Sequence, residues 1–418
     1  MLARLTRLLF PADPVQRALS VSTMSGSLAT GLFYSVSALY FTRVIGLEAT
    51  TVGVGLTIAG AVGVAVSFAG GYACDRLGAD RLQVWGNAVQ AVAFLAYVLA
   101  ENAIAFTVIA CVMVGSRSLQ GTAKATVQAR WFQSSERVAI RARLRVITNV
   151  FIGLGTVLAG AALVIDTAVA YQATMVFTGL FAAAATIPLT GLRARIPGFA
   201  ACMDAHLEPD HVPGPSPLRD RTYVTSVALN SVIAMQFGLT SVGVPLWVIT
   251  RTEAPEVVIS ALLVLNTVFV ALFQVRAARG THDIGVAGRT VRRGSLLLAT
   301  ACLVYGAAGS VGAIAAVVLL LSAELLASCA EIWTEAGGWG LAFELADPRS
   351  AGRYQGLSQT GYSIANMIAP ALVTVTAVEH EMAGWVLLAA IFAGARIGVA
   401  VLANRAVARR TPAEALAA

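Results

Sequence analysis

The chain has 418 residues, of which 57% are hydrophobic and only 12% are charged, and its mean hydropathy is +0.76. Ordinary soluble domains contain roughly 25% charged residues, so this composition excludes a soluble globular protein. The formal net charge is +7. Basic loops that face anionic lipid account for this charge without a nucleic-acid partner.

Twelve apolar stretches follow one another along the chain. A hydrocarbon core about 30 Å thick requires about 20 mostly apolar residues per helix, and lipid offers no hydrogen bonds to an open backbone. We therefore predict an all-α integral membrane protein with twelve transmembrane helices. Six lie in the first half, at 18–41, 51–72, 83–99, 103–125, 146–165 and 168–189, and six in the second half, at 223–249, 257–275, 294–309, 312–332, 354–375 and 384–402.

The longest polar stretch, 193–221, is rich in proline and divides the twelve predicted helices into six and six. We predict an N-terminal six-helix bundle at 1–192, a flexible cytoplasmic linker at 193–221 and a C-terminal six-helix bundle at 222–418, with a central cavity between the bundles. The alternative is one merged bundle with a long loop. No cleavage site follows the first span, which is therefore expected to be retained.

The basic residues indicate the orientation, because short cytoplasmic loops collect Lys and Arg. Of the 29 basic residues, all but four fall in loops on one side of the predicted bundle. Arg43 and Arg251 lie on the other side, and Arg117 and Arg396 lie within predicted helices. We predict a multi-pass protein of the cell membrane with both termini in the cytoplasm.

A loop that combines glycines with charged residues follows the second predicted helix, where residues 71–81 read GYACDRLGADR. Gly71 and Gly78 permit a tight reversal, and Asp75 can cap a helix or pair with a base. Arg76 and Arg81 lie at the level of the lipid phosphates. An ordinary helix-loop-helix with a solvated charge cluster would satisfy the same pattern.

This loop resembles the one between helices two and three of the major facilitator superfamily, G-x-L-A-D-R-x-G-R-K. Gly71, Asp75, Arg76 and Gly78 are kept, whereas the basic pair is replaced by Ala79 and Asp80. The resemblance implies that a conformational latch closes the two bundles on the cytoplasmic side. The residues that would form this latch are Gly71, Asp75, Arg76, Gly78 and Arg81.

The fourth predicted helix contains Arg117 within the stretch RSLQG. An unpaired charge there is expensive, so Arg117 is expected to face the interior and find a partner. The stretch is similar to the R-x-x-Q-G element of the twelve-helix proton-linked drug and metabolite exporters, which implies a role in proton coupling. The alternative is a structural hydrogen bond.

The same exporters carry G-P-x-x-G-G in helix five, where this chain has GTVLAG at 155–160, without the proline. Antiport is therefore less strongly implied, but a helix-packing role remains expected for three glycines, Gly121, Gly155 and Gly160.

The tenth predicted helix carries Glu324, Glu331 and Glu335 at helical spacing on one face. A carboxylate buried in a membrane helix is a candidate proton carrier. We predict that Glu324 and Glu331 take part in proton coupling with Arg117. A satisfied structural bond is the alternative for Glu324, and an interfacial position is the alternative for Glu331 and Glu335.

Polar side chains within the predicted helices indicate an amphipathic substrate cavity. Some of them will instead form hydrogen bonds between helices. The candidates are Tyr34, Ser37, Asn149, Asn230, Gln236, Asn266, Tyr362 and Asn366.

We interpret the chain as a secondary transporter that exports a small, largely apolar or cationic organic compound, such as a drug or metabolite, in exchange for protons by alternating access. It is expected to act as a monomer and to use the proton gradient, without a cofactor or metal. Proton-coupled uptake of a nutrient is the alternative. An integral-membrane transferase is disfavoured because the four histidines are dispersed and no catalytic or nucleotide-binding motif is found.

Overall fold

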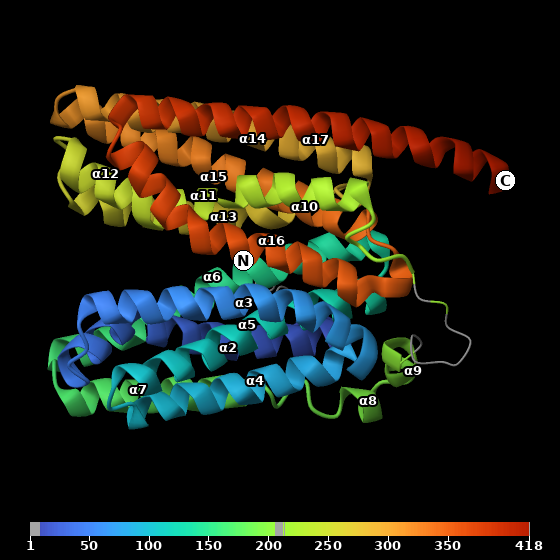
Figure 1. The fold of residues 1–418 in the computed structure, drawn as a ribbon, viewed down its shortest axis with the longest axis horizontal. Coiled ribbons are helices and arrows are strands. Elements are labelled where there is room, and N and C mark those ends of the chain that lie inside the picture. Colours follow the sequence, from blue (N-terminus) through green and yellow to red (C-terminus); the bar gives the residue numbers. More distant parts are fainter. Residues whose placement is uncertain (1–8, 205–211, 213, 418) are drawn as a thin grey trace. The chain divides into compact units, whose positions relative to one another are not determined.

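The computed structural model describes residues 9–204, 212 and 214–417, and within them it contains helices and no strands (Figure 1). The first half forms α2 (Pro14–Leu39), α3 (Ala49–Leu77), α4 (Ala79–Ala96), α5 (Ala103–Trp131), α6 (Ser134–Ile165) and α7 (Ala168–Ala184), followed by the short α8 (Leu192–Arg195) and α9 (Phe199–Asp204). The second half forms α10 (Arg221–Ala234), α11 (Gln236–Gly238), α12 (Val244–Arg251), α13 (Val257–Ala277), α14 (Ile284–Ala307), α15 (Ala313–Glu344), α16 (Ala351–Val373) and α17 (Glu381–Ala417).

The all-helical fold is confirmed, and each of the twelve predicted spans lies on one or more of these helices. Among the described residues, nine helical runs are long and apolar enough to cross a membrane by length and composition. The other three predicted spans lie on α2, α7 and α14. The helix α7 has only 17 residues, and α2 is rich in Ser and Thr. The first half of α14 carries three arginines, Arg289, Arg292 and Arg293.

Helix starts follow ordinary capping chemistry. The side chains of Asp13, Asn102, Asp220 and Asp283 accept hydrogen bonds from backbone amides three residues further on, at 2.6, 2.9, 3.0 and 2.7 Å. These bonds satisfy amides that have no partner within their own helix. The polar residues between the apolar stretches therefore set where α2, α5, α10 and α14 begin.

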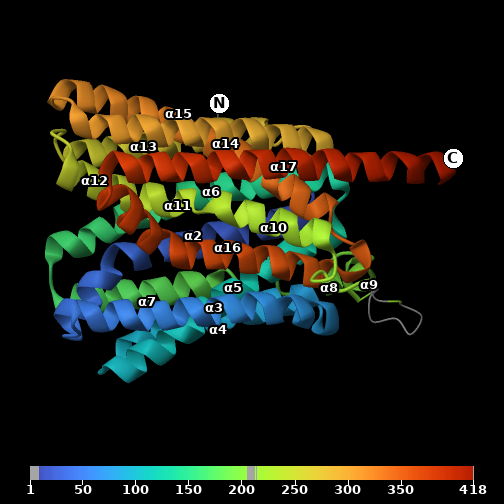
Figure 2. The same cartoon turned by 45° about the horizontal axis from the view of Figure 1, so that its top comes forward.

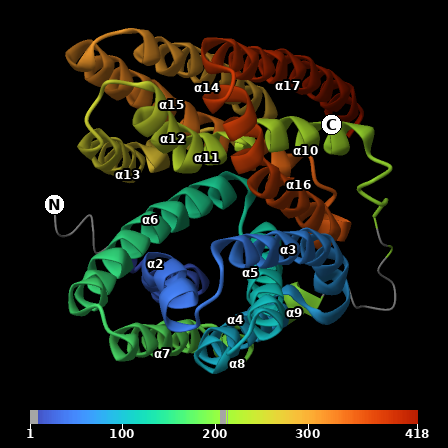
Figure 3. The same cartoon turned by 60° about the vertical axis from the view of Figure 1, so that its left-hand side comes forward.

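The chain forms two compact units, each with its own core. Unit 1 contains residues 1–132, 143–214 and 347–363, and unit 2 contains 133–142, 215–346 and 364–418. Aromatic rings fill the core of unit 1, where α2, α4, α5 and α7 are close neighbours (Figure 3). In unit 2, α14 packs against both α15 and α17, as Figures 1 and 2 show.

Two helices are shared between the units. The start of α6 belongs to unit 2 and its remainder to unit 1, whereas the start of α16 belongs to unit 1 and its remainder to unit 2. The division at 193–221 into two six-helix bundles stays a prediction.

Candidate functional site

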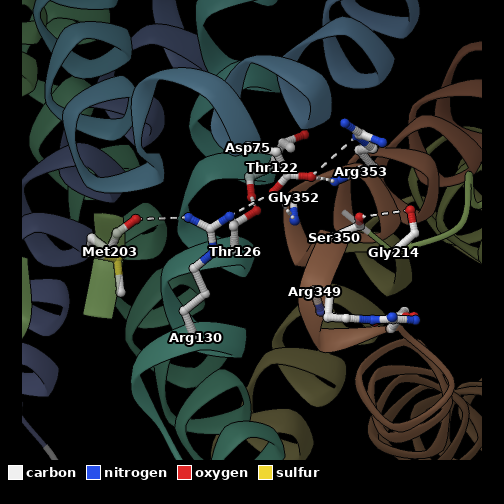
Figure 4. Close-up of polar contacts among 11 residues, drawn as sticks. Asp75, Thr122, Thr126, Arg130, Met203, Gly214, Arg349, Ser350, Gly352 and Arg353 are labelled. Carbon is white, nitrogen blue, oxygen red and sulfur yellow. Dashed lines mark hydrogen bonds and ion pairs between the residues drawn. The ribbon is translucent and has the colours of Figure 1, made fainter. Parts of the chain in front are cut away.

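The Asp75 carboxylate lies at the start of α16, within unit 1 (Figure 4). Its Oδ1 accepts hydrogen bonds from the Gly352 amide at 2.9 Å and from the Arg130 guanidinium at 2.7 Å, and its Oδ2 accepts one from the Arg353 amide at 2.9 Å. The side chains of Asp75 and Arg130 are only 6% and 8% exposed. Asp75 thus satisfies free amides at a helix N-terminus, where the helix dipole also favours a negative charge.

Glycines allow α3 and α16 to approach closely at this point. A Cβ added at Gly71 would lie 2.7 Å from the Gly352 carbonyl oxygen, and one at Gly356 would lie 2.7 Å from the Gly71 Cα. A Cβ at Gly352 would clash with Asp75 Oδ1 itself. Gly78, with φ of +91°, makes the turn between α3 and α4, a conformation that side chains other than glycine rarely adopt.

The linker takes part in this cluster through its first residues. Arg130 also donates to the Met203 carbonyl oxygen at 3.1 Å, as Figure 4 shows. The Arg193 guanidinium pairs with Asp80 at 2.6 Å and with Asp204 at 2.5 Å, and these hydrogen bonds raise the pKa of Arg193. Asp80, which replaces a basic residue of the superfamily pattern, therefore forms an ion pair with Arg193 of the predicted linker.

The other predicted latch residues lie at the edge of the cluster. Arg81 is 3.7 Å from Asp204 with half of its side chain exposed, and Arg76 is exposed without a hydrogen bond or ion pair to any described residue. The structure thus places Gly71 and Asp75 at the contact with α16, Gly78 beside the Arg193 ion pairs, and Arg76 outside both.

A second polar contact lies within unit 2, between the start of α6 and the end of α15. The Arg141 guanidinium lies 5.2 Å from the Trp339 ring centre and 5.6 Å from that of Phe343. The Ser134 hydroxyl donates to Glu344 at 2.6 Å. Cation–π contacts and a charge-assisted hydrogen bond hold this end of α6 in unit 2.

Arg117 finds its partner in Tyr34, within unit 1. The guanidinium donates to the Tyr34 hydroxyl and lies 5.4 Å from the ring centre. Both side chains are exposed, Tyr34 to 55%, and Arg117 makes no ion pair with a described carboxylate. A charge in this position belongs beside water or polar groups rather than lipid.

Glu324 lies deep within unit 2 and is 3% exposed. The Tyr305 hydroxyl of α14 donates to its Oε2 at 2.6 Å, and the Ser328 hydroxyl lies 3.4 Å from its Oε1. Every hydrogen bond that Glu324 makes to a described residue comes from a neutral donor. Tyr305 itself packs against Trp385, and its backbone carbonyl accepts from the Trp247 indole at 2.8 Å.

A polar stripe continues from Glu324 along one face of α15, through Ser328, Glu331 and Thr334. Asn266 of α13 donates to Glu331 at 2.9 Å and to Ser328 at 3.2 Å. Gln236 of α11 donates to Thr334 at 3.0 Å. The steps of four, three and three residues keep these side chains on one face, so the stripe runs about three turns of helix.

The remaining predicted cavity residues have separate surroundings. Asn230 lies beside Gly338, at which an added Cβ would be 3.1 Å from the Asn230 Oδ1. Ser37, Asn149 and Tyr362 are half-buried, and Asn366 is exposed. Asn266 and Gln236 make hydrogen bonds between helices, as expected for some of this set.

The three glycines predicted for helix packing differ from one another. A Cβ at Gly155 would clash with the Leu28 carbonyl oxygen of α2, and one at Gly121 would lie 3.2 Å from Gln359. A Cβ at Gly160 would meet no atom within 4 Å. The packing role expected for Gly160 therefore has no contact to support it, although Ala159 and Ala162 of the same stretch of α6 are buried in the core of unit 1.

Sequence reasoning missed the residues that hold Asp75 and Glu324. Arg130, Gly352 and Arg353 come from helices far along the chain, and Tyr305 reads as an ordinary aromatic residue of an apolar helix. One signal was present for α16: the stretch DPRSAGR at 347–353 is typical of a helix start, where free amides attract a carboxylate.

Comparisons with known proteins agree with this architecture. A family model described as Major Facilitator Superfamily matches residues 19–370, whereas no curated protein matches the chain. A bacterial homologue of the iron transporter ferroportin in an outward-facing state has a similar fold, with a TM-score of 0.75, 13% identity and coverage of 94% of this chain and 98% of that one.

Two further solved structures share the fold. The transporter FucP in the outward conformation gives a TM-score of 0.71 at 14% identity, covering 93% of this chain and 98% of that one. The human organic anion transporter MFSD10 (TETRAN) gives 0.67 at 17% identity, covering 93% and 99%. The predicted resemblance is confirmed: this chain belongs to the Major Facilitator Superfamily and is a multi-pass membrane transporter rather than an enzyme.

Proposed function

We propose that the protein exports a small organic compound in exchange for protons, by alternating access, as a monomer in the cell membrane with both termini in the cytoplasm. The observation that carries the proton coupling is the environment of Glu324. A carboxylate that is held in a low-dielectric interior by neutral donors alone is costly to keep charged, so the neutral acid is well accommodated there. Gain and loss of a proton at Glu324 would change the charge buried in unit 2.

The stripe on α15 surrounds Glu324 with hydroxyl groups and places a second carboxylate, Glu331, further along the helix. Tyr305, Glu324, Ser328, Asn266 and Glu331 are joined by hydrogen bonds of 2.6 to 3.4 Å. The hydroxyl groups of Tyr305 and Ser328 can both donate and accept, as proton transfer to and from Glu324 requires, whereas the Asn266 amide nitrogen only donates and so interrupts the relay between Ser328 and Glu331. We therefore assign Glu324 as the proton carrier and Glu331 as the next carboxylate along α15.

Alternating access requires contacts that form in one state and break in another. The bonds from Asp75 to the first amides of α16 support a latch role for Asp75, because they join the last turn of α3 to a helix of the second half. Arg130 balances the charge of Asp75 while the latch is closed. Loss of these bonds would free the start of α16 to move.

Arg117 supports a substrate class. Arg117 is exposed as a residue, its guanidinium donates to a neutral tyrosine, and no described carboxylate neutralises it. Such a group favours compounds with a carboxylate, phosphate or other acceptor over purely cationic ones. This proposal replaces the largely apolar or cationic compound expected from the sequence with one that carries an anionic or strongly accepting group.

The test uses purified protein in vesicles with an imposed pH gradient and a panel of organic anions and cations. A compound found to move uphill is then measured with Glu324→Gln, using Glu253→Gln as a matched control at a loop residue. We expect Glu324→Gln to abolish uphill movement while downhill exchange persists. Uphill movement at the wild-type rate by Glu324→Gln would remove proton coupling at this residue, and movement of compound along the proton flux would establish uptake instead of export.

A further inference from the structure

The helices α14 and α17 of unit 2 pack against each other in an antiparallel arrangement that fixes their register. A Cβ added at Gly288 would clash with Ala403, and one at Gly306 would lie 2.9 Å from the Trp385 Cβ. Seven residues, about two turns, along α14 from Gly288 and seven residues back along α17 from Ala403 bring Arg396 opposite Ser295. Arg396 therefore lies on the side of α17 that faces α14.

Arginines gather around this level of the contact. Arg292 of α14 lies about one turn from Ser295, with Arg289 and Arg293 beside it. Arg289 and Arg293 are exposed, and Arg292 and Arg396 are half-buried. None of the four makes a hydrogen bond or ion pair with a described residue, and the buried Nε of Arg396 has no partner there.

Negative charge is missing from the stretches of both helices that carry these arginines. The sequence has no Asp or Glu from 284 to 307 in α14, or from 382 to 409 in α17. Four guanidinium groups thus lie within a few turns of one another on helix stretches without a carboxylate, although Asp283 caps the start of α14 and Glu381 begins α17. In a membrane helix such groups require an anionic partner from outside the two helices, or contact with water.

Apolar side chains next to the arginines indicate what that partner is. Leu296 of α14 is 46% exposed, and Ile397 and Val401 of α17 are 62% and 44% exposed. In a protein that spans a membrane, exposed apolar residues of this kind contact acyl chains. The surface therefore combines a site for an anionic headgroup with a neighbouring site for its hydrocarbon chains.

We propose that the lipid-facing side of the α14–α17 contact binds an anionic phospholipid. Arg292 and Arg396 hold the phosphate, since the planar guanidinium can donate two hydrogen bonds to it. Arg289 and Arg293 add attraction at longer range, and the acyl chains lie against Leu296 and Ile397. Under the predicted orientation this site is in the cytoplasmic leaflet, where anionic lipids attract basic residues.

The test measures lipid retained by the full chain in native mass spectrometry, with phosphatidylglycerol and phosphatidylcholine of identical acyl chains as probes. Wild type is expected to retain phosphatidylglycerol preferentially. The double variant Arg292→Gln/Arg396→Gln should lose about tenfold or more of that retention, because each arginine near the membrane surface contributes appreciably to the attraction. The control Arg276→Gln/Arg279→Gln removes the same charge from exposed positions at the end of α13 and should behave as wild type.

Two further measurements keep the outcome decisive. Millimolar inorganic phosphate should not displace the lipid, because it lacks acyl chains, and displacement would identify a free-phosphate site instead. Arg292→Lys/Arg396→Lys should retain more phosphatidylglycerol than the Gln pair, and this comparison replaces the Gln pair if that variant does not fold. Equal losses in the two Gln pairs, or no preference for phosphatidylglycerol in wild type, would overturn the proposal.

Discussion

Asp75 and Glu324 are both largely buried carboxylates, yet their surroundings differ in kind. Asp75 faces a guanidinium and two backbone amides at the start of a helix, whereas Glu324 faces a tyrosine and a serine hydroxyl. Cations and helix N-termini favour the ionised form, and neutral donors in an apolar core accommodate the acid. Both carboxylates are buried, so the charge of their partners is the feature that distinguishes the two sites.

The largest effect is expected from breaking the charge balance at Asp75. Asp75→Asn leaves Arg130 buried without its carboxylate, and removal of one partner of a buried ion pair costs about 3–5 kcal/mol. Transport in vesicles should fall at least about tenfold, with the protein still folded and inserted by size-exclusion chromatography.

A double variant sharpens this prediction. Asp75→Asn combined with Arg130→Gln removes both charges, so its loss should be smaller than the sum of the two single losses. Additive losses would show that Asp75 and Arg130 act independently, and near-normal transport by Asp75→Asn would remove the latch.

The next effect concerns the space around Asp75. Gly352→Ala places a Cβ against Asp75 Oδ1, and such overpacking typically costs about 1–3 kcal/mol. We expect a lower thermal midpoint and slower transport. Gly153→Ala is the control, because its Cβ would meet no atom within 4 Å and alanine favours helix. A decrease of the same size in both variants would mean that helix propensity, and not the contact, is responsible.

A smaller effect is expected at Glu324, the carboxyl group that has only neutral donors. Tyr305→Phe removes the 2.6 Å hydrogen bond to Glu324 and leaves a buried acceptor without its best donor, at a cost of about 1–3 kcal/mol. Gradient-driven transport should slow about tenfold, while downhill exchange changes little. Tyr97→Phe is the matched control, since the buried Tyr97 hydroxyl has no partner among the described residues. Equal rates in the two variants would count against a role for Tyr305 in coupling.

The smallest effect is expected in the linker. Arg193→Gln breaks the pairs with Asp80 and Asp204, but the Arg193 side chain is 24% exposed, and partly solvated pairs of this kind contribute about 1 kcal/mol or less. The thermal midpoint should drop slightly more than for Arg195→Gln, whose side chain is exposed. High salt should reduce the difference between the two variants.

The sequence located the helices well because membrane insertion is a local property of about 20 consecutive residues. It also found Asp75, Glu324 and Arg117, since a charge within or beside an apolar helix is conspicuous in one dimension. The helices α2 and α14 are less apolar than their neighbours, because they carry hydroxyl groups and arginines. By hydropathy alone, α2 and α14 are therefore weaker candidates for membrane spans than the other long helices.

The tertiary structure decided which residues form hydrogen bonds with these charged side chains. Asp75 meets Gly352 and Arg353 across 277 and 278 residues of chain, and Glu324 meets Tyr305 across a helix contact. Hydrogen bonds act over about 3 Å in space and carry no trace in the local pattern of residues. The sequence by itself determined that this protein is a bundle of membrane helices with a few internal charges. Packing decided whether each charge faces a cation, a helix N-terminus or a neutral hydroxyl, because only the folded chain brings those groups into contact.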